Sequence, residues 1–196
     1  MNMEYETDSP TIYTDSALII YFSATGNTEK VAYAIRNALE KEKVTTTFLK
    51  VTEAAEEELY DYDLVFLGSP SIMWLPAKPV LSYIEEKHRL HGKRGEVKLC
   101  APKLPGKTAV VFCTYAGPHT GIDEGITAGK YMRQFFEHIG FEVADEWYIV
   151  GEVHGSEEAS TRGRLGDIRG HPNDQDLAQV ENDVSRLVRS LLAKRK

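Results

Sequence analysis

Cysteine is scarce in this 196-residue sequence: Cys100 and Cys113 are the only two, and they form no Cys-x-x-Cys pair. That scarcity argues against a disulfide framework or a cysteine zinc site and favours the reduced thiols of the cytoplasm. No apolar run approaches the roughly 18 residues of a membrane-spanning helix. Residues 1–16 are polar and acidic, unlike a secretory signal peptide. The net charge of −7 argues against a nucleic-acid partner. We therefore expect a cytoplasmic protein that binds neither a membrane nor nucleic acid.

What is present is the composition of an ordinary globular domain. Apolar residues make up 42% of the chain and charged residues 27%, close to the average of folded proteins. A chain of this length fits one domain, and it can bury a core without the help of a metal or a disulfide. We predict a single domain over residues 1–196, with a polar leader at 1–16 and insertions at about 88–106 and 152–173.

Apolar runs alternate with helical patterns along the chain. Residues 17–22 (ALIIYF) are almost wholly apolar, which is typical of a strand buried on both faces. From Thr28 onward, apolar residues recur at the spacing of a helix with one buried face. This alternation predicts a single-domain, three-layer α/β fold, in which an open parallel five-stranded sheet carries helices on both faces. The other expected strands are 44–51, 64–68, 108–114 and 142–153, and the other expected helices are 77–86, 127–139 and 177 onward, with a weak acidic helix at 53–61.

The topology assigns the connecting loops to two edges of the sheet. Loops that leave strands lie at the carboxyl edge, where open α/β folds bind their ligands. The basic segment 88–106, which holds His88 and His91, follows a helix and therefore belongs at the opposite edge. We interpret it as a solvated insertion in preference to a partner patch, and a metal site is the weakest alternative. The loops expected at the carboxyl edge are 23–28, 69–76, 114–124 and the stretch after Val153.

The strongest local motif is the loop between the first strand and the first helix. Hydroxyl side chains, an amide and a glycine stand at the amino end of a helix, where free N–H groups and the helix dipole favour an anion. The loop lacks the lysine that a nucleoside-triphosphate-binding loop places before its serine or threonine, and it lacks the second glycine of a dinucleotide-binding loop. Both kinds of nucleotide site are therefore disfavoured. It predicts one terminal phosphate held by neutral donors, with simple helix capping as the alternative. The residues are Ser23, Ala24, Thr25, Gly26, Asn27 and Thr28.

The string from Tyr21 to Glu29, YFSATGNTE, resembles the phosphate-binding fingerprint of the flavodoxins. The order of elements, the positions of the loops and the length are also similar over most of the chain. The resemblance implies strand order 2-1-3-4-5 and non-covalent binding of flavin mononucleotide (FMN). Flavodoxins are the standard example of a ligand at the switch point between strands one and three, and we expect FMN there.

The resemblance also implies roles for the two other loops. The second loop is similar to the family's loop beside the isoalloxazine ring, and Trp74 stands where a stacking residue is expected; the core edge or a dimer contact is the alternative. In the third loop Tyr115 is a further stacking candidate. His119 is the candidate catalytic residue, as a proton donor to the reduced ring, with an exposed loop histidine as the alternative. The other expected cofactor-binding residues are Ser69, Pro70, Ser71, Ile72, Met73, Thr114, Ala116, Gly117 and Gly121.

Several functions are compatible with this resemblance. An electron carrier would exchange electrons with redox partner proteins through FMN, whereas a reductase would take hydride from NAD(P)H and reduce a quinone or another small acceptor. A third alternative is a binding module that keeps the fold and has lost the flavin. The arginines and histidines of 152–173 either fold over the flavin or belong to a flexible linker. Exposure of Trp74 and the long loops favour a homodimer.

Overall fold

The computed structural model describes residues 16–193, so the predicted leader at 1–16 lies outside the described residues except for Ser16. The predicted fold is confirmed: five parallel strands form one open sheet in the order β2-β1-β3-β5-β6, which is the expected 2-1-3-4-5 order once a short extra strand, β4, is counted. The strands are β1 (Ser16–Tyr21), β2 (Thr45–Lys50), β3 (Leu64–Ile72), β4 (Leu75–Pro76), β5 (Thr108–Tyr115) and β6 (Glu142–Val150). The helices are α1 (Asn27–Lys41), α2 (Lys78–Lys93), α3 (Asp123–His138), α4 (Glu157–Thr161) and α5 (Asp174–Ala193).

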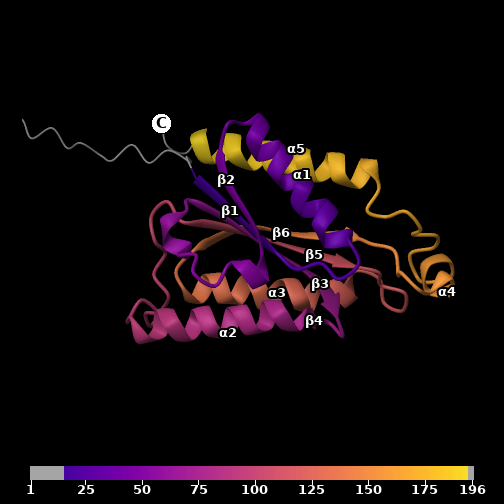
Figure 1. Ribbon diagram of the computed structural model, residues 1–196, viewed down its shortest axis with the longest axis horizontal. Helices are drawn as coiled ribbons and strands as arrows, with labels where there is room; N and C mark the ends of the chain where they lie inside the picture. The colour runs from indigo at the N-terminus through magenta and orange to yellow at the C-terminus, as the bar shows by residue number, and fades with distance from the viewer. Residues whose placement is uncertain (1–15, 194–196) are drawn as a thin grey trace, which may run out of the picture.

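The inner strand β1 shows why the sheet is covered on both faces. Its side chains alternate between two buried clusters: Ala17, Ile19 and Tyr21 pack with α1 and α5, while Leu18 and Ile20 pack with α2 and α3. Figure 1 shows the same arrangement, with α1 and α5 above the sheet and α2 and α3 below it. Burial of each large aliphatic side chain stabilises the fold by about 1.5–3 kcal/mol, so the doubly covered strand fixes the sheet as a rigid base for the loops.

Strand β3 is longer than the sequence predicts. The expected strand at 64–68 was to stop at Ser69 and Pro70, but these two residues continue the parallel pairing with Cys113 and Thr114 of β5. Pro70 lacks a backbone N–H and so removes one hydrogen-bond donor from the pairing of β3 with β5. The residues before it keep their parallel pairing with β5. The chain then turns back at once, and β4 pairs antiparallel with the last residues of β3.

Helix α2 is also longer than predicted, and the expectation that His88 and His91 lie in a loop is wrong. The helix continues to Lys93, so only the remainder of the segment 88–106 connects it to β5. The buried face of the helix includes Lys87 and His91, which occupy the positions where a stripe of apolar residues would continue. The amine of Lys87 donates to the main-chain carbonyls of Ala55, at 2.8 Å, and Glu57. These two buried polar side chains conceal the helical pattern in the sequence.

The acidic stretch 53–61 contains no α-helix. It is bounded by two short 3-10 turns, η1 (Val51–Glu53) and η2 (Leu59–Asp61). Glu58, at the start of the second turn, forms an ion pair with Arg94 just beyond α2, so this stretch is tied to the basic segment.

The two ends of the described chain lie at the amino edge of the sheet. Strand β1 starts there, and the last helix returns beside the carboxyl end of α1, where the Lys41 amine lies 2.6 Å from the Glu181 carboxylate and Arg189 lies 2.9 Å from Glu42. In Figure 1 these ends are on the left, and the loops that follow the strands are on the right. Among residues 16–193, no helix is both long and apolar enough to cross a membrane.

Candidate functional site

Two adjoining cavities lie at the carboxyl edge, and the predicted loops line both of them. The first has a volume of about 290 Å³ and the second about 460 Å³. Ser71, Tyr115 and Ala116 line both, so together they form one elongated site. The rest of the first cavity is lined by Ser23, Ala24, Thr25, Asn27, Thr28, Pro70, Ile72, Thr114, Gly151, Glu152, Val153 and His154, and the rest of the second by Met73, Trp74, Pro118, His119, Thr120 and Glu124.

The first cavity adjoins the amino end of α1. Gly26 precedes the helix with φ +98°, a left-handed conformation that glycine adopts without strain, and its surroundings are open. Its N–H donates to the hydroxyl of Ser23 at 3.1 Å, which closes the loop on itself. No side chain of the described residues caps the helix through a hydrogen bond. The first-turn N–H groups therefore remain available to an anion, and simple capping does not account for the motif.

The fingerprint side chains divide between structural and ligand-facing positions. The Thr28 hydroxyl is buried and lies 2.7 Å from the hydroxyl of Thr114, which joins α1 to β5. The Asn27 amide donates to the main-chain carbonyl of Glu152 at 3.0 Å. Thr25, by contrast, is exposed at the mouth of the first cavity. Thr25 and the helix N–H groups are thus the most accessible donors for a phosphate.

The second cavity is bounded by the β3–β4 hairpin. Its turn consists of Met73 and Trp74, both with positive φ, at 50° and 66°. Two-residue hairpins favour this left-handed turn, but they normally use asparagine and glycine for it. Bulky residues in such a conformation cost of order 1 kcal/mol each. Trp74 remains 54% exposed, so the hairpin holds a large aromatic surface at the cavity at some cost in stability.

The third loop is pinned from within. One carboxylate oxygen of Glu124 accepts from the N–H groups of His119 and Thr120, both at 2.8 Å, and its main-chain carbonyl accepts from the Ser71 hydroxyl. Gly117 has positive φ, and a Cβ atom there would lie 2.4 Å from the carbonyl oxygen of Gly121. The loop therefore requires glycine at 117 and presents a fixed main chain to the second cavity.

His119 and Tyr115 occupy different environments in this loop. The side chain of His119 is exposed and lines the second cavity together with Trp74. Tyr115 is only 8% exposed, and its ring packs so closely on Gly125 that a Cβ there would approach within 3.1 Å. Burial raises the pKa of the Tyr115 hydroxyl. The ring of Tyr115 is thus part of the wall, whereas His119 is free to reach a bound molecule.

Four of the predicted site residues shape the site without lining either cavity. They are Gly26, Ser69, Gly117 and Gly121. Ser69 is fully buried, and its hydroxyl accepts from the N–H of Ala77 at 2.8 Å, which fastens the base of the hairpin. Its position indicates a structural contribution, as do the turn positions of the three glycines.

A fourth segment completes the site, and the sequence predicts its position together with the histidines and arginines of 152–173 as candidates to fold over the flavin. Gly151 to His154 leave the end of β6 and line the first cavity. The following residues are ordered rather than a flexible linker: the N–H of Arg164 donates to the carbonyl of Pro118 at 2.8 Å, and α4 lies beside the site. Two signals in the sequence pointed to this segment: it follows a strand at the carboxyl edge, and it holds the arginines and histidines of 152–173.

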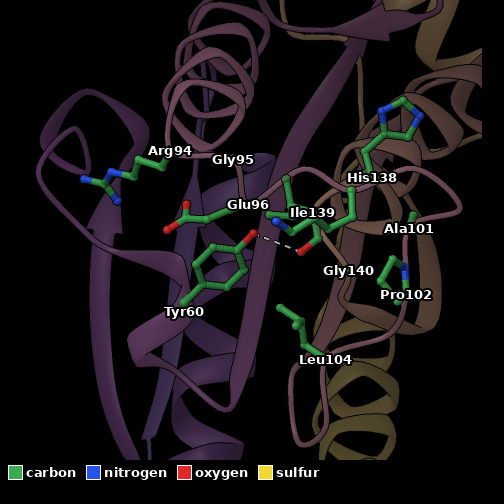
Figure 2. A pocket seen from close by; sticks show the side chains of 11 residues that line it. Tyr60, Arg94, Gly95, Glu96, Ala101, Pro102, Leu104, His138, Ile139 and Gly140 are labelled. Atoms are coloured by element: carbon green, nitrogen blue, oxygen red, sulfur yellow. Dashed lines mark hydrogen bonds between the residues drawn. The ribbon is translucent and has the colours of Figure 1, made fainter.

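A separate cavity of about 410 Å³ lies at the opposite edge of the sheet, where the basic segment was expected (Figure 2). Tyr60, Arg94 and Glu96 form one side of it, and Leu104, Ile139 and Gly140 face them. The Tyr60 hydroxyl donates to the carbonyl of Ile139 at 3.0 Å. Beneath it, His91 is fully buried, with its ring nitrogen Nδ1 2.7 Å from the Glu96 carboxylate. These contacts stabilise the connection from α2 to β5.

Comparison with known proteins agrees with this geometry. The family model of the flavodoxin domain matches residues 18–75, which contain most of β1, the fingerprint and the hairpin as far as Leu75. The crystal structure of oxidised flavodoxin 1 from Bacillus cereus superposes with a TM-score of 0.62 at 16% identity, over 89% of this chain and 97% of that one. This chain has the flavodoxin-like fold.

Two further comparisons concern a curated relative and a solved structure. A curated NAD(P)H dehydrogenase (quinone) from Archaeoglobus fulgidus is 28% identical over 189 residues, spanning 82% of this chain and 88% of its own. The structure of a Fusobacterium nucleatum flavodoxin bound to flavin mononucleotide has a TM-score of 0.56 at 13% identity, over 94% of this chain and 99% of that one. The relatives thus include both an enzyme of quinone reduction and an FMN-bound flavodoxin.

Proposed function

We propose that this flavodoxin-like protein binds FMN non-covalently and transfers electrons through it. The observation that carries the proposal is the elongated site itself, in which an uncapped helix end and a cavity flanked by Trp74 lie next to each other at the carboxyl edge. A cofactor with a phosphate at one end and a flat aromatic system at the other matches that arrangement.

The residues of the chain would hold the two ends of the cofactor differently. Thr25, Ser23 and the first-turn N–H groups of α1 would bind the phosphate, with no lysine or arginine among the residues lining that cavity. Trp74 would cover the ring and exclude water, while the pinned main chain of the third loop offers hydrogen bonds along the ring edge. FMN, when bound, supplies the redox chemistry, and the protein sets its orientation and electrostatic surroundings.

The direct test is an absorbance spectrum of the purified protein after incubation with FMN and removal of free flavin. We expect flavin absorbance to remain with the protein at about one flavin per chain. A protein that stays colourless would overturn the proposal and would favour a binding module that has lost its flavin.

A second candidate, NAD(P)H-dependent reduction of a quinone, is supported by the Archaeoglobus fulgidus relative and by the second cavity, which has room beside Trp74 and His119. In this function NAD(P)H and a small acceptor replace a redox partner protein. His119 would then donate a proton at the ring or the acceptor. Prompt anaerobic bleaching of the flavin by NADH or NADPH, followed by recolouring on addition of a quinone, would support the reductase. Absence of bleaching by both nucleotides would favour the carrier.

We also propose a cytoplasmic location and a homodimer. Two free cysteines, one of them exposed, support the reducing compartment. The apolar tip of the hairpin, with Ile72, Met73, Trp74 and Leu75 all exposed, supports self-association. Cell fractionation tests the first proposal and analytical ultracentrifugation the second; a monomer at micromolar concentration would contradict the dimer.

A further inference from the structure

The phosphate end of the site contains one histidine, from outside the fingerprint. Among the residues that line the first cavity, Glu152 has the one carboxylate side chain and His154 the one basic side chain. Both come from the segment after β6. A phosphate bound by the neutral fingerprint would therefore meet one carboxylate and one imidazole.

The fingerprint itself holds His154 in place. Its ring nitrogen Nε2 lies 3.3 Å from the side-chain oxygen of Asn27, and its Nδ1 lies 3.2 Å from the Glu152 carboxylate. The Asn27 amide also donates to the carbonyl of Glu152, which fixes the orientation of that side chain. Gly151 allows this approach, because a Cβ atom there would lie 2.6 Å from the Asn27 nitrogen. The histidine is thus attached to the first turn of α1.

These contacts are best satisfied by a protonated imidazole. Both ring nitrogens face oxygen acceptors, and only the imidazolium form has a donor on each nitrogen. The charged groups around it are Glu152 on the same segment and, next to Glu152, Arg169. The second oxygen of Glu152 accepts from the N–H of Gly170.

We propose that His154 is a phosphate-binding residue that supplies the positive charge missing from the fingerprint. The inference rests on the proposed binding of FMN and adds a further binding residue to the same site. Protonated His154 strengthens the binding of FMN, which has a phosphate, and leaves the binding of riboflavin, which has none, unchanged.

The test compares the dissociation constants of FMN and riboflavin for the wild type, His154→Gln and His154→Lys, by quenching of flavin fluorescence. His88→Gln, on the exposed face of α2, is the matched control for loss of a histidine. We expect the wild type to bind FMN about three- to tenfold more tightly than His154→Gln at about pH 6, with the two proteins equal in riboflavin affinity. His154→Lys should restore tight binding of FMN.

Each alternative outcome is decisive. An unchanged FMN affinity in His154→Gln, or an equal loss of riboflavin affinity, would overturn the inference while FMN binding by the wild type still stands. A failure of His154→Lys to restore binding would likewise contradict the role of charge. If the wild type binds no FMN, both the inference and the proposed function fail.

Discussion

Thr25 is the residue on which the phosphate assignment can be tested most cleanly. It is exposed at the mouth of the first cavity, so its replacement removes a donor without disturbing the core. For Thr25→Ala we expect FMN affinity to fall by roughly five- to thirtyfold, the equivalent of about 1–2 kcal/mol for a hydrogen bond to a charged group. Fluorescence titration measures this, with Thr45→Ala, exposed at the start of β2, as the control. An equal loss of riboflavin affinity would place Thr25 elsewhere than at the phosphate.

The two cysteines should differ sharply in reactivity. Cys113 is fully buried on β5, and burial raises the pKa of its thiol to about 12, while Cys100 is exposed. The reactive thiolate is therefore scarce at Cys113 throughout the neutral range, because its proton is lost only as the pH nears that raised value. We expect a thiol reagent at pH 8 to modify one cysteine rapidly in the native protein and the second only after unfolding. Rapid modification of both would contradict the packing of β5.

At the scale of the element, the β3–β4 hairpin lowers the stability of the fold but holds an aromatic side chain at the proposed flavin site. Replacement of Met73 by Asn and Trp74 by Gly supplies the residues that its left-handed turn favours. We expect the double variant to gain about 1–2 kcal/mol of stability, a rise in Tm of roughly 3–6 °C. Removal of the aromatic surface should lower FMN affinity at the same time, by about 0.5–1.5 kcal/mol.

Calorimetry and flavin titration of the hairpin variant check the two effects separately. A lower Tm would show that the apolar tip is covered in solution, for instance by a second chain. Single Trp74→Phe keeps an aromatic ring and should retain most of the affinity.

The elements differ in how far the sequence could predict them. Strand β1 was predictable because its residues are apolar on both faces, and the position of the loop after it because a loop that leaves a parallel strand lies at the carboxyl edge. The end of α2 was not, since Lys87 and His91 are buried through polar partners that lie distant in the sequence. Binding residues after β6 could be placed at the correct edge, but the contact of His154 with Asn27 depends on tertiary structure alone.

For the whole molecule, a bound cofactor should raise the stability of the folded state. A ligand that binds only the folded protein contributes about 2.7 kcal/mol at a concentration of 100 Kd. For a chain of 196 residues this corresponds to a rise in Tm of roughly 5–10 °C. Thermal unfolding with and without FMN measures it, and an unchanged Tm at high FMN concentration would count against binding to the folded state.

The position of the chain ends has a practical consequence. Ser16 and the end of α5 lie at the amino edge, across the full length of the strands from the proposed flavin. Anchoring the protein to an electrode through its carboxyl terminus would therefore leave the flavin side turned toward the solution. In that orientation a soluble mediator or a docking protein could approach the flavin. The sheet would lie between the flavin and the electrode surface and would prevent direct contact.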